Sequence, residues 1–459
     1  MTLFGSSGTR GVATRKVGPE FAARLAAAAA TVWDADRVAL ARDTRTTGGL
    51  LADAAAAGLA GAGATVERLG VLPTPGAQTH ADREGVPALV VTASHNPPEY
   101  NGLKLVEADG VEATLGTLRA VEEVFEAESH DRAAWDAVGA RFRVDGAGES
   151  YVEGIVDAVD RSAIGAADLT VALDPGHGSG CETTPDLLRR LGCRVLTVNA
   201  QPDGHFPGRD PEPVPEHLAD LRRLVRASDA DLGVAHDGDA DRAIFVDESG
   251  EQVSGDASFA ALAAADLAPG DTLVSAVNVS GRVVDAVEAA GAALSLTPIG
   301  STHIVSRVRE LRDGGVPVPV AGEGNGGVAF PPYRLARDGA YTAARFLELV
   351  ADAPASEVVA PHGGYRAERR AIEHGGDPAP LLAAVQDAAE RAADGEGPLA
   401  ADAPPDLTTI DGYRLDYDGA WVLARASGTE PVVRVVGEAR DPDRAASLVE
   451  RMADVARDA

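Results

Sequence analysis

Lysine is nearly absent from this chain of 459 residues: Lys16 and Lys104 are the only two, although lysine and arginine together number 41. Aspartate and glutamate number 71, which gives a formal net charge of −30. Such an acidic surface repels polyanions, and this argues against nucleic acids and anionic membranes as partners. Exchanging lysine for arginine while adding carboxylates fits adaptation to high salt, where charge repulsion is screened. A merely acidic protein from an ordinary habitat is the alternative.

Cysteine is equally rare, since Cys181 and Cys193 are the only two and their spacing matches no metal-ligand motif. We interpret both as packing residues of an intracellular enzyme. The chain has no run of 18 apolar residues, so the sequence predicts no transmembrane helix. Residues 1–16 contain no apolar signal core, and we therefore expect a cytoplasmic protein.

Apolar residues make up 45% of the chain, which is enough to build the cores of three or four domains of ordinary size. Short apolar runs typical of strands alternate with helical patterns, which predicts α/β domains with mainly parallel sheets covered on both faces. Strands are expected at 317–321 and 408–415, among others. The stretch 4–11 is rich in glycine, and taken alone a disordered start explains it equally well.

The stretch 92–102, with the sequence TASHNPPEYNG, follows an apolar run that predicts a short buried strand. Loops at strand ends carry the chemistry of many α/β enzymes. Ser94 lies just past the strand beside His95, and Lys104 follows closely. On local grounds alone a polar turn is the commoner explanation, because adjacent side chains on a strand or turn point apart.

The stretch 237–242, with the sequence DGDADR, follows a second predicted strand. In an extended segment, alternation would place Asp237, Asp239 and Asp241 on one side. Three clustered carboxylates repel one another and need a cation, and their hard oxygen ligands select Mg²⁺ or Ca²⁺. A structural calcium loop or an acidic turn is the alternative on local grounds.

Two further stretches combine glycine with polar side chains. In GEGNGG at 322–327, Glu323 and Asn325 are suited to hydrogen-bond sugar hydroxyls, although a hairpin turn is the plainer interpretation. In RASGTEP at 425–431, Arg425 and the nearby Arg434 can pair with a phosphate, while hydroxyls and amides take its other oxygens. An ordinary surface turn is the alternative there. The glycine-rich turn at 174–180 lacks the Walker lysine, so we favour a tight turn over a phosphate site.

Together with FGSSGTRG at 4–11, these stretches resemble the α-D-phosphohexomutases, the family of phosphoglucomutase, phosphomannomutase and phosphoglucosamine mutase. Five motifs in the same order cover nearly the whole chain. The resemblance implies four domains around a central cleft: three related α/β/α domains with mixed sheets and a smaller α+β C-terminal domain. We expect a phosphoserine-loop domain at 1–148, a metal-loop domain at 149–252, a sugar-loop domain at 253–358 and a phosphate-binding domain at 359–459.

The resemblance also implies a mechanism. A phosphoryl group on Ser94 passes to a hexose or hexosamine phosphate, which forms a 1,6-bisphosphate, and the other phosphate then returns to the serine. Mg²⁺ would be bound by Asp237, Asp239, Asp241 and an oxygen of the phosphoserine. The substrate phosphate would bind to the C-terminal loop, through Arg425, Ser427, Gly428, Thr429 and Arg434.

Other residues of these motifs are expected to support the transfer. Lys104, Arg10 and Arg242 would supply positive charge, and His95 would position phosphate or help to move a proton. Lys104 is our candidate general base, because nearby arginines would depress its pKa. Glu323 and Asn325 would bind sugar hydroxyls.

Departures from the family pattern bear on the substrate. Asn325 replaces the usual serine and Gly327 a common histidine, a form that resembles archaeal members of broad specificity. The sugar, whether glucosamine, mannose or glucose phosphate, therefore stays open, as does the choice between monomer and homodimer. A sugar-phosphate phosphatase and a non-catalytic sugar-phosphate sensor are the alternative functions.

Overall fold

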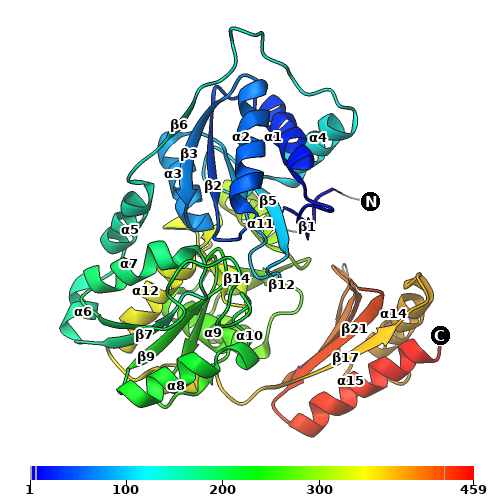
Figure 1. The fold of residues 1–459 in the computed structure, drawn as a ribbon. Helices are drawn as coiled ribbons and strands as arrows, with labels where there is room; N and C mark the ends of the chain where they lie inside the picture. The colour runs from blue at the N-terminus through cyan, green and yellow to red at the C-terminus, as the bar shows by residue number, and fades with distance from the viewer. Residues whose placement is uncertain (1–2, 6–7, 428–429) are drawn as a thin grey trace. The chain divides into compact units, whose positions relative to one another are not determined.

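The computed structural model describes residues 3–5, 8–427 and 430–459 (Figure 1). The chain divides into two compact units, one made of residues 1–262 and 300–361 and the other of residues 263–299 and 362–459. Within the described residues, no helix combines the length and the apolar character needed to cross a membrane.

The first sheet of unit 1 has six strands in the order β1-β5-β4-β2-β3-β6. Its strands are β1 (Thr9–Val12), β2 (Arg37–Arg42), β3 (Thr65–Val71), β4 (Ala88–Val91), β5 (Tyr100–Val106) and β6 (Arg141–Arg143). β2 pairs in parallel with both β3 and β4, whereas β5 runs antiparallel to β1 and β4. The sheet is therefore mixed: β4, β2, β3 and β6 run parallel to one another, and β5 runs antiparallel to its two neighbours.

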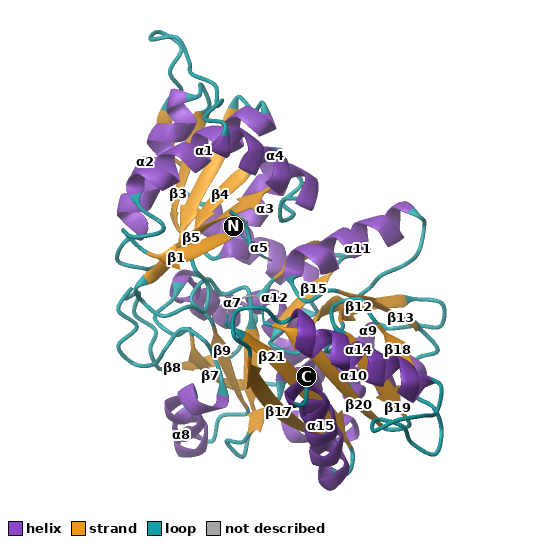
Figure 2. Ribbon diagram, turned by 90° about the vertical axis from the view of Figure 1, so that its right-hand side faces the viewer, coloured by secondary structure: helices purple, strands orange, loops and turns teal. Residues whose placement is uncertain are grey.

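Helices cover both faces of this first sheet (Figure 2). One face packs against α1 (Pro19–Trp33), α2 (Gly48–Gly61) and α4 (Leu115–Glu126), and the other against α3 (Thr74–Glu84). Alanines dominate the α1–α2 contact. The two helices approach so closely that a Cβ on Gly58 would lie 2.0 Å from the carbonyl oxygen of Ala23, so glycine is required there.

The second sheet of unit 1 has five strands in the order β11-β10-β9-β7-β8. Its strands are β7 (Thr170–Asp174), β8 (Arg194–Thr197), β9 (Leu232–His236), β10 (Ala243–Val246) and β11 (Gln252–Val253). The helices of this region are α5 (Ala147–Ala158), α6 (Arg161–Ala166), η1 (Ser179–Glu182), α7 (Thr184–Arg190), η2 (Pro215–His217) and α8 (Ala219–Ser228). β9 lies between its parallel neighbour β7 and its antiparallel neighbour β10.

Unit 1 also contains an antiparallel set of three strands, β14 (Ala321–Glu323), β15 (Gly327–Phe330) and β16 (Arg334–Arg337). The helices around it are α11 (Ser301–Asp313), α12 (Gly339–Val350) and α13 (Ala355–Val359), followed by η3 (Ala360–His362). Helix α9 (Gly255–Asp266) spans the position at which the two units divide.

Unit 2 begins with the parallel pair β12 (Thr272–Ala276) and β13 (Ala293–Thr297), joined by α10 (Gly281–Ala289). Its C-terminal part is an antiparallel sheet in the order β17-β21-β20-β19-β18. These strands are β17 (Arg366–Glu373), β18 (Asp406–Thr408), β19 (Tyr413–Tyr417), β20 (Ala420–Ala426) and β21 (Val432–Ala439), accompanied by α14 (Ala379–Ala393) and α15 (Pro442–Arg457).

The predicted fold class, α/β with mixed sheets and a smaller C-terminal α+β part, is confirmed. The strand expected at 317–321 is wrong, because Pro317 and Pro319 have no N–H to donate to a ladder and the strand begins only at Ala321. The strand expected at 408–415 is two strands, separated by a turn in which Gly412 has a φ of 90°. The start of the chain contributes the edge strand β1.

The two cysteines are free thiols, and burial raises the pKa of each to about 12. Neither thiol belongs to the cluster of possible metal ligands found among the described residues. Both therefore fit the packing role expected from the sequence.

Candidate active site

Two loops that follow central strands meet in unit 1. The first follows β4 and contains Ser94, which is fully buried and has a φ of 51°. The second follows β9 and begins with Asp237. Ser94 Oγ donates a hydrogen bond to Asp237 Oδ2 at 2.6 Å, across 143 positions of sequence. The two stretches that the sequence singled out thus meet, although the strands they follow belong to different sheets.

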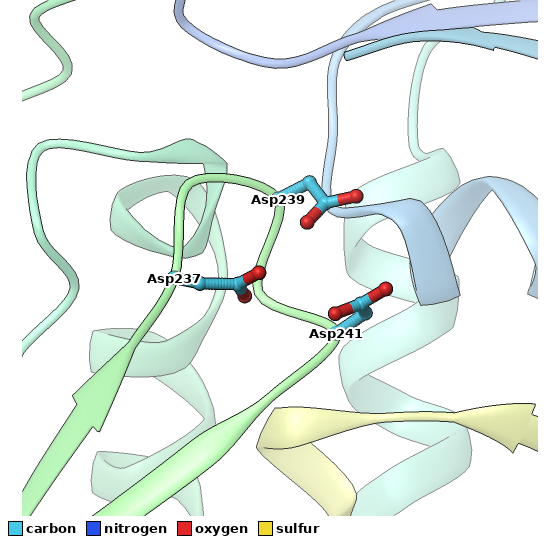
Figure 3. A group of neighbouring side chains, drawn as sticks. All are labelled: Asp237, Asp239 and Asp241. Atoms are coloured by element: carbon cyan, nitrogen blue, oxygen red, sulfur yellow. The ribbon is translucent and has the colours of Figure 1, made fainter. Parts of the chain in front are cut away.

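Three aspartates converge in the second loop (Figure 3). Asp237, Asp239 and Asp241 are buried, and each offers a carboxylate oxygen within 4.8 Å of the others. The expected extended alternation is wrong. The loop turns instead, with a φ of 53° at Ala240, whose N–H donates to the carbonyl of Asp237 at 3.2 Å. The turn, not a strand, makes the carboxylates converge.

The mutual repulsion of these carboxylates bears on their pKa values. Burial raises the pKa of Asp237, and the charges of Asp241 and Asp239 raise it further. Burial also opposes ionisation of Asp241, but Arg337, Lys104 and Arg242 outweigh it and hold the pKa of that group well below its usual range. Burial and the neighbouring carboxylates thus oppose ionisation of Asp237, whereas the cationic neighbours of Asp241 favour it.

Two oxygens of the cluster are left for such a cation. Asp239 Oδ1 and Asp241 Oδ1 are buried and have no hydrogen-bond partner among the described residues. A buried acceptor without a partner is costly, so these atoms indicate a bound species. Hard carboxylate oxygens in this number suit a divalent cation such as Mg²⁺. The residues present therefore fit a metal.

The other oxygens of the same carboxylates are held by protein donors. Lys104 Nζ donates to Asp239 Oδ2 at 2.7 Å and to Asp241 Oδ2 at 2.9 Å. Thr74 Oγ1 donates to Asp239 Oδ2 at 2.6 Å, and Arg337 Nη2 donates to Asp241 Oδ2 at 2.6 Å. These contacts orient the carboxylates so that their Oδ1 atoms stay free.

Sequence reasoning missed Thr74 and Arg337. Thr74 follows β3, close to the end of a strand, and that position was the one available signal. Arg337 ends β16, and no local motif marks it.

The environment of Lys104 contradicts one expectation. Burial lowers its pKa, but the carboxylates of Asp239 and Asp241 more than compensate, and the net shift is upward. The expected depression by arginines is therefore wrong, and Lys104 stays an ammonium ion. Its assignment as general base loses its physical basis, whereas its role as a positive charge gains one.

His95 lies beside the serine and is neutral. Arg242 Nη2 donates to His95 Nδ1 at 3.0 Å, and Ser94 Oγ lies 3.2 Å from the same nitrogen. Because a guanidinium can only donate, Nδ1 must be an acceptor, which places the ring proton on Nε2. Burial, together with the charges of Arg242 and Arg10, holds the pKa of His95 far below its usual value.

Two arginines complete the positive side of the cluster. The buried Nε of Arg242 has no hydrogen-bond partner among the described residues, and it lies 3.9 Å from Asp241 Oδ1. Arg10, on β1, donates from Nη1 to Asn96 Oδ1 at 3.3 Å. The structure thus brings Arg10, Arg242, Lys104 and His95 together around Ser94 and the aspartates, as the sequence analysis expected.

The stretch expected to bind the sugar is a hairpin between β14 and β15. Asn325 Oδ1 accepts from the N–H of Gly327 at 3.0 Å, and Asn325 Nδ2 lies 3.5 Å from Glu323 Oε2. A Cβ on Gly327 would lie 2.8 Å from Cδ of Arg337. The glycine found in place of a common histidine therefore makes room for this arginine.

The stretch expected to bind phosphate lies in unit 2. Arg425 and Arg434 face each other as partners across β20 and β21, an arrangement that suits an anion between them. Arg425 Nε lies 3.3 Å from Asp411 Oδ2, and Arg434 donates to Glu430 Oε2 at 2.6 Å. The N–H of Ser427 donates to the carbonyl of Val432 at 2.9 Å. Gly428 and Thr429 lie outside the described residues.

Four family models match the chain in order. They are described as phosphoglucomutase/phosphomannomutase alpha/beta/alpha domains I, II and III and the C-terminal domain of the same proteins. They match residues 1–132, 149–250, 254–362 and 377–455, respectively.

Individual relatives agree with these matches. The chain is 39% identical to a phosphoglucomutase/phosphomannomutase of Thermococcus kodakarensis, over 98% of this chain and 97% of the relative. It is 36% identical to a probable phosphoglucosamine mutase of Methanopyrus kandleri, over 99% and 97% of the two chains. A solved structure of a phosphoglucomutase/phosphomannomutase family protein from Burkholderia thailandensis superposes with a TM-score of 0.85 at 27% identity, covering 100% and 97% of the chains. The motifs, the fold and these matches agree, and the chain belongs to the phosphoglucomutase/phosphomannomutase family.

Proposed function

We propose that this protein is a Mg²⁺-dependent phosphohexomutase. It interconverts the 1-phosphate and 6-phosphate of a hexose or hexosamine through a phosphorylated Ser94 and a 1,6-bisphosphate. The observation that carries the proposal is the direct contact of Ser94 Oγ with the aspartate cluster, at 2.6 Å from Asp237 Oδ2. A serine in that position can carry a phosphoryl group next to a cation that neutralises it.

Asp237, Asp239 and Asp241 would hold the metal together with an oxygen of the phosphorylated Ser94. When bound, Mg²⁺ supplies positive charge to the phosphoryl oxygens and holds them in line for transfer. The partnerless Oδ1 atoms of Asp239 and Asp241 support this assignment.

The surrounding side chains act on the phosphoryl group by charge and position. Lys104, Arg10 and Arg242 place three fixed cations around Ser94, and phosphoryl transfer depends chiefly on such charges and on in-line geometry. The neutral ring of His95 accepts from Arg242, which orients that guanidinium toward the transferring group.

The remaining candidates would bind the substrate. Glu323 and Asn325 face the sugar hydroxyls in this proposal. Arg425, Ser427, Gly428, Thr429 and Arg434 bind the phosphate that is not being transferred. The four domains would be 1–148, 149–252, 253–358 and 359–459, each carrying one of these loops, and the spans of the family models support that division.

We infer a substrate range that includes glucosamine, mannose and glucose phosphates. The names of the relatives, one a phosphoglucomutase/phosphomannomutase and another a probable phosphoglucosamine mutase, support this range. A cytoplasmic location and a monomeric or homodimeric state complete the proposal.

The test is a substrate panel. Purified protein with Mg²⁺ and glucose 1,6-bisphosphate is given the 1-phosphates of glucosamine, mannose and glucose, and the 6-phosphates are measured. We expect turnover of at least one. Release of free sugar and inorganic phosphate instead would identify a phosphatase. Binding without turnover by protein phosphorylated on Ser94 would identify a sensor.

A further inference from the structure

Arg45, three residues after the end of β2, is a fully buried arginine close to the active site. All five N–H groups of its guanidinium are engaged. Nε donates to Asp43 Oδ2 at 3.1 Å, Nη1 donates to the carbonyls of Pro97 and Tyr100, and Nη2 donates to the carbonyls of Ser94 and Asn96. These four carbonyl contacts measure 2.6 to 2.9 Å. No N–H of Arg45 is left for a substrate.

The loop that carries Ser94 is therefore folded around a buried cation. Without the guanidinium, the carbonyls of Ser94, Asn96 and Tyr100 would lose the donor that Arg45 provides, and that of Pro97 would keep only the N–H of Tyr100 at 3.0 Å. Asp43 balances the charge and extends the network. Its Oδ2 accepts from Thr92 Oγ1 at 2.7 Å, and Thr92 Oγ1 in turn accepts from the N–H of Ser94 at 2.9 Å.

Ser94 is held at both of its peptide groups, its N–H by Thr92 and its carbonyl by Arg45. Its φ of 51° lies in the left-handed region, which residues other than glycine adopt rarely and at a cost in free energy. Such a conformation persists only where the surroundings impose it, and here the imposing groups are the Arg45 network.

We propose that Arg45 is a positioning residue for phosphoryl transfer: it acts through the loop backbone to aim Ser94 Oγ at the aspartate cluster and at the reacting phosphoryl group. The proposal rests on the phosphohexomutase function proposed above. It assigns to Arg45 no contact with substrate or metal.

The experiment compares Arg45→Lys and Thr92→Val with the parent enzyme on whichever sugar phosphate the parent converts best. A misaligned nucleophile should lower kcat by about 100-fold in Arg45→Lys and about 10-fold in Thr92→Val, with KM changed less than about threefold. Phosphorylation of Ser94 by glucose 1,6-bisphosphate, followed by intact mass, should slow in parallel. In Arg45→Ala, added guanidinium should restore part of the rate.

Arg451→Lys is the matched control, since Arg451 also donates to two backbone carbonyls, those of Pro398 and Ala400, but in the C-terminal part of the chain. Thr92→Val keeps the side-chain volume and removes no charge, so it tests the network even if Arg45→Lys does not fold. An unchanged kcat in folded Thr92→Val, or losses in Arg45→Lys matched by Arg451→Lys, would overturn the proposal. An inactive parent would instead reject the phosphohexomutase function itself.

Discussion

One buried arginine supports the loop that carries Ser94 (the serine loop), and another supports the loop of the three aspartates, which we propose to bind Mg²⁺ (the metal loop). Arg209 repeats the pattern of Arg45 donor for donor: Nε donates to Asp174 Oδ2, Nη1 to the carbonyls of Asp210 and Pro211, and Nη2 to the carbonyls of Asp174 and His236. Asp43 directly follows β2, whose parallel neighbour β4 leads into the serine loop. Asp174 ends β7, whose parallel neighbour β9 leads into the metal loop. Each reactive loop is thus built against a buried guanidinium.

The two arginines differ in the backbone carbonyls to which their guanidinium groups donate. Arg45 binds carbonyls within the serine loop, including that of Ser94 itself, and Ser94 is the left-handed residue. Arg209 binds the carbonyl of His236, just ahead of the first aspartate, and the left-handed residue is the spacer Ala240. In the serine loop the residue with the unfavourable positive φ is therefore the proposed nucleophile itself. In the metal loop it is a residue between the proposed ligands. We expect Arg45 to affect phosphoryl transfer and Arg209 to affect Mg²⁺ binding.

Removing the nucleophile should have the largest effect. Ser94→Ala should lower mutase activity by on the order of 10⁴-fold or more, because no phosphoryl acceptor remains. Mg²⁺ binding, measured by calorimetry, should weaken far less than activity. Mutase turnover that survives the substitution would mean that the serine loop is not the reacting partner of the pair.

Removing one metal carboxylate should come next. Asp239→Asn should reduce kcat by about 10² to 10³-fold, because the charge on the transferring group is no longer neutralised. Chelation of Mg²⁺ from the parent should abolish turnover, and added Mg²⁺ should restore it. Full activity after exhaustive chelation would contradict a metal role for this loop.

A Mg²⁺ titration should distinguish the role of Arg209 from that of Arg45. Arg209→Lys should weaken Mg²⁺ binding by about 10- to 100-fold, the usual cost of disturbing the support of metal ligands. Raising the Mg²⁺ concentration should recover most of its kcat but little of that lost in Arg45→Lys. Equal recovery of kcat in Arg209→Lys and Arg45→Lys would contradict the proposal that the two arginines affect different steps.

The smallest effect is expected from a single supporting hydroxyl. Thr74→Val removes the 2.6 Å hydrogen bond to Asp239 Oδ2 and should weaken Mg²⁺ binding by about 10-fold. Lys104 still donates to the same oxygen, so the carboxylate keeps a partner. A larger loss than that of Arg209→Lys would place the control of the metal loop at its carboxylates and not at its backbone.

The sequence predicted the serine loop and the metal loop because the residues that mark each loop are adjacent in the chain. Ser94 and the three aspartates stand in short polar segments after apolar strands, and such segments can be recognised without knowing the fold. Arg45, Arg209, Thr74 and Arg337 stand in ordinary surroundings, and their roles depend on which segments meet in the folded chain. Such contacts join distant parts of the sequence, so the sequence could not assign them.

Two expectations failed for the same physical reason. The aspartate segment was expected to be extended, but Ala240 adopts a positive φ, which its residue type does not suggest. The pKa of Lys104 was expected to fall because of nearby arginines, yet the carboxylates from another loop dominate it. In both cases the contacts come from distant parts of the chain, since in the aspartate segment the N–H of Gly339 donates to the carbonyl of Ala240 at 3.1 Å.

The burial of Lys104 has a practical consequence for labelling this protein. Its side chain is 3% exposed and its amine is held by two carboxylates, whereas Lys16 is exposed. Apart from the α-amino group, a reagent for primary amines should therefore modify the folded protein at a single side chain. A fluorophore or surface tether can be attached through Lys16 without mutagenesis, and delayed modification of Lys104 would report opening of the active site.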